Sequence, residues 1–582
     1  MKKSILSVLF VLLVATSSSQ SMSMIWTGGV YDAIGSFPGF GESIVLDASG
    51  NSYTTGSFSG TMDFDPGVGV YNLASAGSGS SVFILKLDAS GNFVWAKSFS
   101  GGVTASALCY SIALDDDGNI FTAGDFTGTV DFDPGAGIAN LTVAGLGSFY
   151  DIFTAKLDPS GNYLWAKRIG AANEDNALAI AVDRSGSLYT TGIFRTTVDF
   201  DPGPGTYTAS VTTGGLGIYL MKLDSLGNFL WAKTMVGSSG PDGGQGHGVV
   251  TDRDNNVYYT GHFNGTLDFD PGPGTFNMST LGPSSHFVFV SKLDSLGNFV
   301  WAKKMGGAAV TYARSITIDT ANNIYTTGWF NGTTDFDTGA GVFNLIGTPN
   351  HDVFISKIDS IGDFVWAKKI GGSQQEESFS VVVDSNSNVY TTGGFTGFVD
   401  FDPGASTFFM TSSSGGVDSD IFISKLDSLG NFEMAVHIGG NASVYAKSIQ
   451  VDEFDNVFIT GSYVGTTDFE PGPGVYNMST PSTNGAFVEK LHQSLLGINE
   501  LSQAGQISIY PNPTSSSFTL FTSEQIKNGS IEIYNRIGSL VLNQKITSQQ
   551  NAIDLKNFAT GIYFVKVMSE GKIVGMQKVV KQ

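Results

Sequence analysis

The chain has 582 residues, 41% of them hydrophobic, so it is long enough to bury a core in several domains or in one large repetitive domain. It carries 52 acidic against 30 basic residues, a net charge of -22, which argues against electrostatic binding to nucleic acid or to anionic lipid headgroups. Glycine contributes 75 residues and charged residues only 14%, a composition typical of turn-rich β structure.

The N-terminal segment MKKSILSVLFVLLVATSSSQ places two lysines before a short apolar run, which small polar residues follow. This pattern predicts a secretory signal peptide over residues 1–21. The apolar run is too short to span a bilayer, and no later segment has about 18 consecutive apolar residues, so we expect no transmembrane segment. Cys109 is the only cysteine, which excludes an internal disulfide.

A segment typified by TGSFSGTMDFDPG at residues 55–67 occurs seven times, every 65 to 69 residues, which indicates a repeat architecture. Each unit divides into four strand-like pieces, which in the first unit are SIVLDASGN, SYTTGSFSGTMDFDPG, FILKLDASGN and FVWAKSFSGG. Tight turns with Gly-Asn join the pieces. Four antiparallel strands per unit, seven units and no helical periodicity predict an all-β fold, a seven-bladed β-propeller over residues 22–491.

The two ends of the repeat array complement each other. The seventh unit has three strand-like pieces, at 449–452, 457–469 and 487–491, but no fourth. MIWTGG at residues 24–29 resembles the missing piece. Its Trp26 stands where the other units have Trp95, Trp165, Trp231, Trp301 and Trp366. We therefore predict that the N-terminal strand completes the last blade and closes the ring.

The motifs LDxxGNxxWAK and YTTGxFxGTxDFDPG resemble those of the bacterial β-propeller repeat family called SBBP. The resemblance covers roughly residues 24–491. It implies a propeller fold, and it leaves the activity open because this fold hosts unrelated functions.

Two carboxylates end each repeated segment, and they have two possible roles. In Asp65-Pro66-Gly67, Asp can cap a turn while Pro and Gly fill its central positions, so a structural turn is the favoured interpretation. The alternative is a Ca²⁺ site in each blade, because oxygen ligands one residue apart could share a cation. The candidate metal ligands are Asp63, Asp65, Asp131, Asp133, Asp199, Asp201, Asp268, Asp270, Asp335, Asp337, Asp400, Asp402, Asp468 and Glu470. No other cofactor is expected.

Features that recur in every blade are what a blade needs, so we expect function where the units differ. The differences concentrate in two connections, one after DFDPG and one between blades. We expect both connections to emerge on the same face of the propeller, and the DxxGN turns to form a plainer opposite face. The histidines form no metal-binding or catalytic motif, and no G-x-S-x-G is present. We expect scattered surface or packing histidines, although His247 and His262 share a blade and could approach the central channel, where a lyase-type propeller could place a metal. The six are His247, His262, His286, His351, His437 and His492.

These observations favour a non-enzymatic binding or adhesion scaffold for an extracellular glycan, a protein or a neighbouring cell. One alternative is a secreted lyase or hydrolase with a site at the propeller channel. Another is a structural component of the cell surface.

Composition changes after the last repeat. Residues 492–504 resemble a linker, and residues 505–582 carry a formal charge of +4 against about -26 for the preceding chain. Short alternating strands and turns predict a small C-terminal β-sandwich there.

The tail resembles the type A C-terminal sorting domain of the type IX secretion system. The matching residues are Tyr510, Pro511, Asn512, Pro513, Gly561, Tyr563, Lys566, Gly571, Lys572, Lys578 and Lys581. The resemblance implies type IX machinery as partner, passage through the outer membrane and removal of the tail. Release from the cell or attachment to surface lipopolysaccharide would follow.

Overall fold

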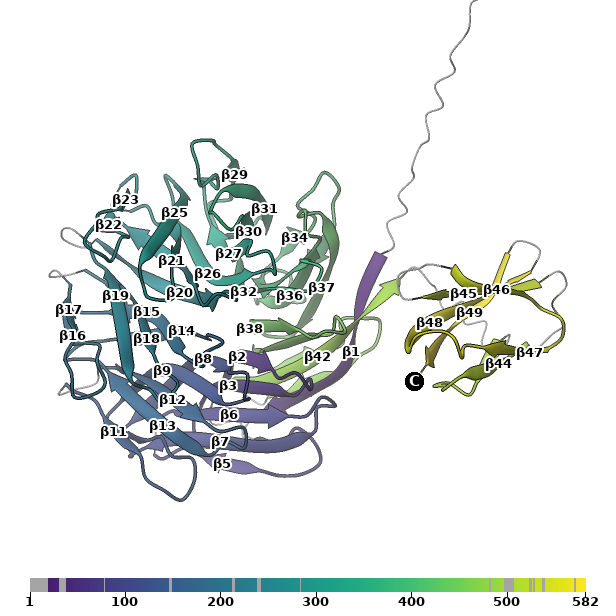
Figure 1. Ribbon diagram of the computed structural model, residues 1–582, viewed down its shortest axis with the longest axis horizontal. Coiled ribbons are helices and arrows are strands. Elements are labelled where there is room, and N and C mark those ends of the chain that lie inside the picture. Colours follow the sequence, from purple (N-terminus) through teal and green to yellow (C-terminus); the bar gives the residue numbers. More distant parts are fainter. Residues whose placement is uncertain are drawn as a thin grey trace, which may run out of the picture. The chain divides into compact units, whose positions relative to one another are not determined.

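Figure 1 shows the computed structural model of the protein. It describes residues 19–30, 38–77, 79–145, 149–211, 215–237, 242–282, 284–480, 483–496, 507–522, 526, 529–535, 540–569 and 572–581. Two compact units divide the chain: one runs Ser21–Ser494 and the other contains Leu495–Gln582. Over these described ranges the fold is all-β, and no helix is long and apolar enough to cross a membrane. The predicted signal peptide up to residue 18 and the linker beyond residue 496 lie outside the described residues.

The larger unit repeats a four-stranded antiparallel sheet, giving it a propeller-like fold (Figure 1). The first strands are β2 (Gly39–Leu46), β8 (Ser106–Leu114), β14 (Asn176–Val182), β20 (Gly243–Thr251), β26 (Thr311–Ile318), β32 (Glu376–Val383) and β38 (Val444–Val451). The second strands are β3 (Ser52–Phe58), β9 (Ile120–Thr127), β15 (Leu188–Phe194), β21 (Val257–Asn264), β27 (Ile324–Phe330), β33 (Val389–Phe395) and β39 (Val457–Tyr463).

The outer half of each sheet follows the same order. The third strands are β6 (Ser81–Leu87), β12 (Asp151–Leu157), β18 (Gly217–Leu223), β24 (Phe287–Leu293), β30 (Asp352–Ile358), β36 (Asp420–Leu426) and β42 (Gly485–Leu496). The fourth strands are β7 (Phe93–Gly101), β13 (Tyr163–Ile169), β19 (Phe229–Met235), β25 (Phe299–Gly307), β31 (Phe364–Gly372), β37 (Phe432–Gly440) and, in the last sheet, β1 (Ser19–Val30).

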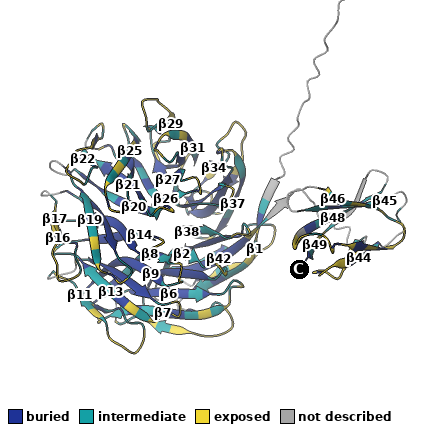
Figure 2. Cartoon of the chain, viewed as in Figure 1, coloured by how far each residue is buried: buried dark blue, intermediate teal, exposed yellow. Residues whose placement is uncertain are grey.

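Neighbouring sheets pack face to face through apolar side chains. Each first strand contacts the first strand of the next unit, and β38 contacts β2, so these strands gather around a common centre (Figure 1). The second and third strands are almost entirely buried, whereas exposed residues lie on the fourth strands and loops (Figure 2). Both faces of the inner strands are therefore covered by neighbouring sheets.

The prediction that the second strand runs unbroken to DFDPG was wrong. In the first unit the strand ends at Phe58, and Gly60 adopts a φ of +69°, which interrupts the strand. The residues after this break form a separate short hairpin. These hairpins are β4–β5 (Thr61–Asp63, Asn72–Ala74), β10–β11 (Thr129–Asp131, Asn140–Thr142), β16–β17 (Thr197–Asp199, Thr208–Ser210), β22–β23 (Thr266–Asp268, Asn277–Ser279), β28–β29 (Thr333–Asp335, Asn344–Ile346), β34–β35 (Phe398–Asp400, Phe409–Thr411) and β40–β41 (Thr466–Asp468, Asn477–Ser479).

Several of these hairpins link adjacent units. Strand β10 pairs with β7 of the preceding sheet, and β28, β34 and β40 pair in the same way with β25, β31 and β37. The hairpins therefore add backbone hydrogen bonds to the apolar packing between units.

The aspartate of each DxxGN turn organises the turn. Asp47 Oδ1 accepts hydrogen bonds from the backbone N–H groups of Ser49 (2.9 Å) and Asn51 (3.0 Å), and Asp47 Oδ2 accepts one from Asn51 Nδ2 (2.7 Å). Gly50 has a φ of +78°, which a tight turn requires. The carboxylate therefore fixes the connection between the first and second strands.

Strand β1 forms the outer edge of the last sheet, whose order is β1-β42-β39-β38. Trp26 of β1 lies against Gly91 in the first unit, where an added Cβ would be 2.5 Å from the indole. Trp165 stands in the same relation to Gly227 of the next unit, with a corresponding distance of 3.0 Å. Trp26 thus packs as the tryptophans of the other fourth strands do.

The smaller unit contains two antiparallel sheets around one apolar core. The first has the order β43-β44-β47, with strands Ile507–Tyr510, Ser517–Thr522 and Gln550–Asp554. The second has the order β46-β45-β48-β49, with strands Leu540–Lys545, Gly529–Asn535, Gly561–Ser569 and Lys572–Lys581. Buried residues of both sheets, including Leu520 and Val565, share the core.

We predict that deleting residues 24–29 lowers the melting temperature sharply, because the last sheet then loses its edge strand and β42 exposes unpaired backbone groups. Thermal unfolding followed by circular dichroism measures the effect. Ile25→Ala is the matched control, since the Ile25 side chain is 47% exposed and should change little. An unchanged melting curve for the deletion would contradict the structural role of β1.

A carboxyl group is buried in the same sheet without compensation. Glu489 of β42 is fully buried, and neither carboxylate oxygen hydrogen-bonds to any described residue. Burial, with the nearby charges of Glu470 and Asp468, raises the pKa of Glu489 well above its ordinary value. The corresponding position of the third unit holds Met221. The ionised carboxylate of Glu489 therefore destabilises the last sheet.

We predict that Glu489→Met stabilises the protein at pH 7–8 by roughly 1–3 kcal/mol, the usual cost of an unsatisfied buried polar group. Because the folded-state pKa is raised, the wild type loses stability as pH rises above the ordinary carboxyl value near 4.5, so the gain should shrink toward pH 4. Denaturant unfolding across this pH range tests the prediction. Met221→Glu should show the opposite trend, and identical pH profiles for wild type and Glu489→Met would refute it.

Candidate functional site

Each first strand carries a β-bulge at one equivalent position. The register against the second strand skips one residue in all seven sheets, and the skipped residues are Glu42, Tyr110, Leu178, His247, Arg314, Phe379 and Lys447. A bulge redirects a side chain out of the regular alternation of the strand. The bulge is common to all units, but the residue at its tip differs in each one.

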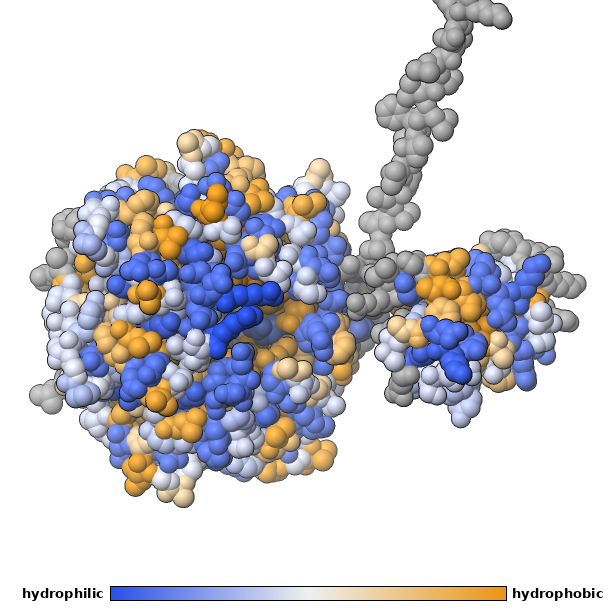
Figure 3. Space-filling view, in the orientation of Figure 1, coloured by the Kyte–Doolittle hydropathy of each residue, from blue (hydrophilic) through white to orange (hydrophobic). Residues whose placement is uncertain are grey.

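The bulged residues of different sheets affect one another electrostatically. Lys447 interacts with both Glu42 and Arg314, and Arg314 also interacts with His247. Burial lowers the pKa of Lys447, with Arg314 adding to the effect and Glu42 opposing it. Burial raises the pKa of Glu42, and Lys447 partly offsets this. The titratable bulge residues therefore face a shared central space, and Figure 3 shows hydrophilic residues around the centre of one face.

A cavity of about 330 Å³, called the central pocket here, lies between the fifth, sixth and seventh sheets. It is lined by Arg314, Gln375, Glu377, Phe379, Gly394, Thr396, Ser419, Tyr445 and Lys447. Lys447 Nζ lies 3.8 Å from the centre of the Phe379 ring. Gly394 leaves the space open, because an added Cβ would be 2.5 Å from Ser419 Oγ and 2.9 Å from Tyr445 Cδ1.

One cation of the central pocket, Arg314, is incompletely partnered. Arg314 makes no ion pair with a described residue, and its buried Nε has no hydrogen-bond partner there. Burial would raise the pKa of Glu377, but hydrogen bonds from His351 and Gln375 outweigh it and hold this pKa below its ordinary value. His351 Nδ1 is 2.7 Å from Glu377 Oε1. The pocket therefore combines an anchored carboxylate with two cations and two aromatic rings.

A line of histidine and aromatic rings extends from the pocket toward the fourth sheet. Trp329 and His351 stack with ring centres 3.6 Å apart, and Tyr312 lies 4.6 Å from Trp329. The Tyr312 hydroxyl is 2.8 Å from His286 Nδ1, and the Tyr312 ring lies 3.9 Å from His262. The expectation that the histidines are scattered was wrong for His262, His286 and His351, because strand pairing and sheet packing bring them together. The burial of His262 fits the packing role that was also expected.

His247 and His262 do approach each other, as their shared sheet allows, with ring centres 5.2 Å apart. Burial, followed by Arg314, lowers the pKa of His247 to about 3, and burial lowers the pKa of His262 and of His286. These three rings are therefore neutral at physiological pH, and they offer hydrogen bonds rather than charge. His437 and His492 lie apart from this line: His437 approaches Asp420, and His492 bonds Asn456.

A buried carboxyl group of the second sheet lies beside the bulge residue Tyr110. Asp125 is buried and hydrogen-bonds to Asn176 and Tyr110. Burial raises the pKa of Asp125 to about 7, although both of these hydrogen bonds oppose the shift. Asp125 is thus able to exchange a proton near neutral pH, a property that the sequence did not reveal.

The repeated DFDPG carboxylates bind their own backbone. Asp63 Oδ1 accepts hydrogen bonds from the backbone N–H groups of Asp65 (3.1 Å) and Tyr71 (2.8 Å), and Asp65 Oδ1 accepts one from Gly67 (2.8 Å). The other six hairpins repeat these bonds, with Glu470 in the last one. Among the residues described, no three His, Cys, Asp or Glu side chains are grouped to hold a metal ion. Calcium binding at the hairpins stays a prediction.

The two ends of the sorting motif meet in the smaller unit. Asn512 Nδ2 donates to the Lys578 carbonyl (2.6 Å), and Asn512 Oδ1 accepts from the Val580 N–H (2.9 Å). Lys581 Nζ donates to the Phe558 carbonyl. The remaining motif residues do not all lie at this junction.

Tyr510 is 74% exposed, whereas Tyr563 is buried and its hydroxyl donates to the Ala559 carbonyl (2.8 Å). Lys566 pairs with Glu532 (3.2 Å). Pro511 and Pro513 follow Tyr510 and Asn512 in the loop after β43, and Gly561 begins β48. Gly571 lies outside the described residues, as does the side chain of Lys572.

Comparison with known proteins gives partial similarities. The chain is 26% identical over 217 residues to an uncharacterised WD repeat-containing protein, L264, of Acanthamoeba polyphaga mimivirus, covering 32% of this chain and 15% of that protein. It is 31% identical over 126 residues to the ulvan lyase NLR42 of Nonlabens ulvanivorans, covering 20% and 23%. It therefore spans less than a quarter of the length of these relatives. The WD40 β-propeller domain of Doa1 aligns with a TM-score of 0.35 and 8% identity, over 81% of this chain and 97% of that one.

Two family models match separate parts of the chain. Residues 300–337 match the β-propeller repeat SBBP, and residues 508–582 match the secretion system C-terminal sorting domain. The first match lies within the repeated sheets, and the second covers nearly all described strands of the smaller unit. The chain therefore carries an SBBP β-propeller repeat and a type IX C-terminal sorting domain, which directs it to the cell surface or out of the cell.

Proposed function

We propose that this protein is a seven-bladed β-propeller that binds an extracellular glycan without turning it over. The observation that carries the proposal is the central pocket, where Arg314 and Lys447 accompany the rings of Phe379 and Tyr445. A volume near 330 Å³ is at the lower end of the range for small-ligand sites, so the pocket suits one sugar residue rather than a protein surface.

The pocket chemistry favours a glycan with acidic groups. The Arg314 guanidinium can donate hydrogen bonds to two carboxylate or sulfate oxygens, and Lys447 adds a second cation. Gln375, Thr396 and Ser419 offer hydrogen bonds to hydroxyl groups. Aromatic rings can cover an apolar sugar face, and they need little ordering.

The proposed propeller, over residues 22–491, closes through its two chain ends. The contact of β38 with β2 and the position of β1 beside β42 support this architecture. Lys490 Nζ donates to the Ala89 carbonyl (3.3 Å), as Lys156 Nζ donates to the Ser225 carbonyl of the next unit (3.4 Å). In the C-terminal domain, proposed to span 505–582, two sheets with a common core are consistent with a β-sandwich.

A second candidate is a secreted lyase or hydrolase acting near the same pocket. The Tyr312 hydroxyl lies 2.8 Å from Nδ1 of His286, and a neutral imidazole beside a phenol can transfer a proton. Similarity to an ulvan lyase covers only 20% of the chain, so it supports this candidate less than the pocket supports binding. A structural role at the cell surface is a third candidate with no particular contact to favour it.

We predict that the secreted protein binds acidic glycans on a glycan array, and that Tyr445→Ala and Lys447→Met each weaken binding about tenfold, as expected for loss of a charged or aromatic contact. Tyr476→Ala is the control, because Tyr476 is 44% exposed on the distant β40–β41 connection. Chromatography of the bound glycan detects turnover. Equal binding by the pocket variants, or products that disappear with Tyr312→Phe, would overturn the binding proposal.

The tail is proposed to engage the type IX machinery and to be removed after export, with release or attachment to lipopolysaccharide afterwards. We predict that deleting residues 505–582 traps the folded propeller in the periplasm. Asn512→Ala should reduce export, because it removes both hydrogen bonds to the closing strand, whereas Lys556→Ala should export normally. Cell fractionation with immunoblotting measures the result. Normal export of the truncated chain, or a tail retained on the surface protein, would contradict the proposal.

A further inference from the structure

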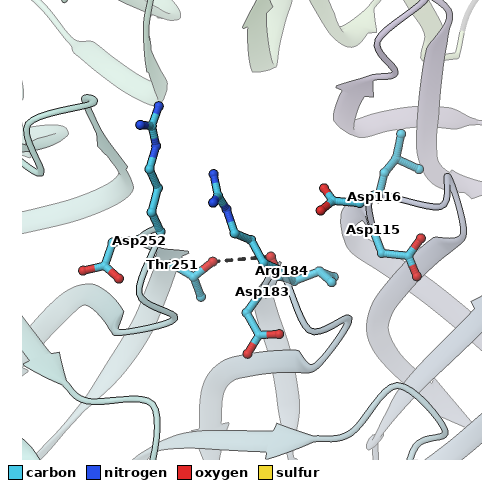
Figure 4. Close-up of a pocket in the computed structure, with 9 residues that line it drawn as sticks. Asp115, Asp116, Asp183, Arg184, Thr251 and Asp252 are labelled. Carbon is cyan, nitrogen blue, oxygen red and sulfur yellow. Dashed lines mark hydrogen bonds between the residues drawn. The ribbon is translucent and has the colours of Figure 1, made fainter.

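A second cavity, called the turn cavity here, lies at the opposite ends of the first strands. It has a volume of about 240 Å³ and lies among the turns that join the first and second strands of the second, third and fourth units (Figure 4). Strands β8, β14 and β20 end there, whereas the central pocket lies at the starting ends of β26, β32 and β38. The face expected to be plain therefore contains a cavity of its own.

Three of the carboxylates around the turn cavity already have partners. Asp115, Asp183 and Asp252 cap their turns, and they pair with Lys156 (3.1 Å), Lys222 (3.0 Å) and Lys292 (3.8 Å). These lysines come from the third strands, so each ion pair stays within its own sheet. The three aspartates are consequently neutralised before any ligand arrives.

The residue after each of these aspartates is charged and exposed. It is Asp116 in the second unit, Arg184 in the third and Arg253 in the fourth. Figure 4 shows Asp116 and Arg184 extending into the same open space. Neither arginine makes an ion pair with any residue that the structure describes. The unpaired groups of the turn cavity thus carry a net charge of +1.

This positive charge is unusual for the molecule. The larger unit has only five arginines, in a chain with 52 acidic residues. Arg168 pairs with Asp151 (2.7 Å), and Arg195 pairs with Glu174 (3.5 Å). The other three line the two cavities: Arg314 the central pocket, Arg184 and Arg253 the turn cavity. The arginines that lack a described carboxylate partner are therefore the ones placed where a ligand can enter.

We propose that the turn cavity binds a tetrahedral oxyanion, a sulfate or phosphate group, through Arg184 and Arg253. Each guanidinium presents a planar fork of N–H donors that matches two oxygens. A carboxylate has oxygens for one fork, whereas sulfate and phosphate have enough for both. Asp116 borders the site and accepts a hydrogen bond from a hydroxyl neighbouring the anion, which suits an ester on a sugar. This site is separate from the central pocket and independent of its proposed ligand.

The test is isothermal titration calorimetry of the full chain with sodium sulfate, sodium phosphate and glucose 6-sulfate, at an ionic strength fixed with sodium chloride. Wild type should bind, and Arg184→Gln or Arg253→Gln should each weaken binding about tenfold, as for loss of a charged hydrogen bond. Arg195→Gln is the control, because it removes a partly exposed arginine that already has a carboxylate partner. Tighter binding of the ester than of the free ions identifies the sugar as its source, and equal binding identifies the free ion.

A further variant separates this site from general attraction to arginine. Asp116→Asn should tighten anion binding, because it removes a negative charge that lines the cavity together with the two arginines. Unchanged melting temperatures ensure that each variant is folded. Absence of binding by wild type, equal binding by the Arg184→Gln/Arg253→Gln double variant, or no effect of Asp116→Asn would overturn the proposal.

Discussion

Packing of one sheet against the next is the interaction on which the larger unit depends. A four-stranded sheet has two apolar faces, and its own unit covers neither of them. The apolar clusters accordingly combine residues of adjacent units, such as Leu220 and Met235 with Val257 and Phe289. Because every sheet needs two neighbours, a stable solution is a series of sheets that returns to its starting point. The nearly complete burial of the second and third strands follows from this requirement.

This constraint determines where function can reside. Side chains at the sheet interfaces pack against the neighbouring sheet. The turn aspartates accept hydrogen bonds from backbone N–H groups and form ion pairs with lysines. Freedom remains at the bulge tips, at the ends of the second strands and at the residue after each turn aspartate. The two cavities are built from such positions. The repeated scaffold can therefore carry different side chains in each unit, because the bulge has the same position in every first strand while the residue at that position differs.

Much of the fold could be predicted from the sequence because it repeats. The period, the four strands and the complementary role of Trp26 are visible as patterns within and between units. The break at Gly60 was missed because an alternating segment resembles one strand whether or not a positive φ interrupts it. The sorting residues were identified from their motifs, yet the hydrogen bonds that join Asn512 to Lys578 and Val580 required the structure.

The candidate site could not be predicted, because its residues come together only through strand register. Tyr312 and His286 are 26 positions apart, and His351 meets Glu377 across another unit boundary. A bulge is also invisible to a period-two pattern, since it adds one residue to one strand without changing composition. Aligning the units would have revealed the variable position, but not the direction of its side chain.

The position of β1 has a consequence for the order of folding. Thr27 donates a hydrogen bond to the carbonyl of Val488, 461 residues later in the chain (3.4 Å). Strand β1 therefore cannot pair until β42, the last strand of the array, has been synthesised. Until then the backbone groups of β1 have no partner strand. Bringing together two strands so far apart in sequence has a larger entropy cost than forming a hairpin of adjacent strands. Pairing of β1 with β42 thus requires a chain that extends through Val488, so a chain truncated before β42 cannot complete this sheet.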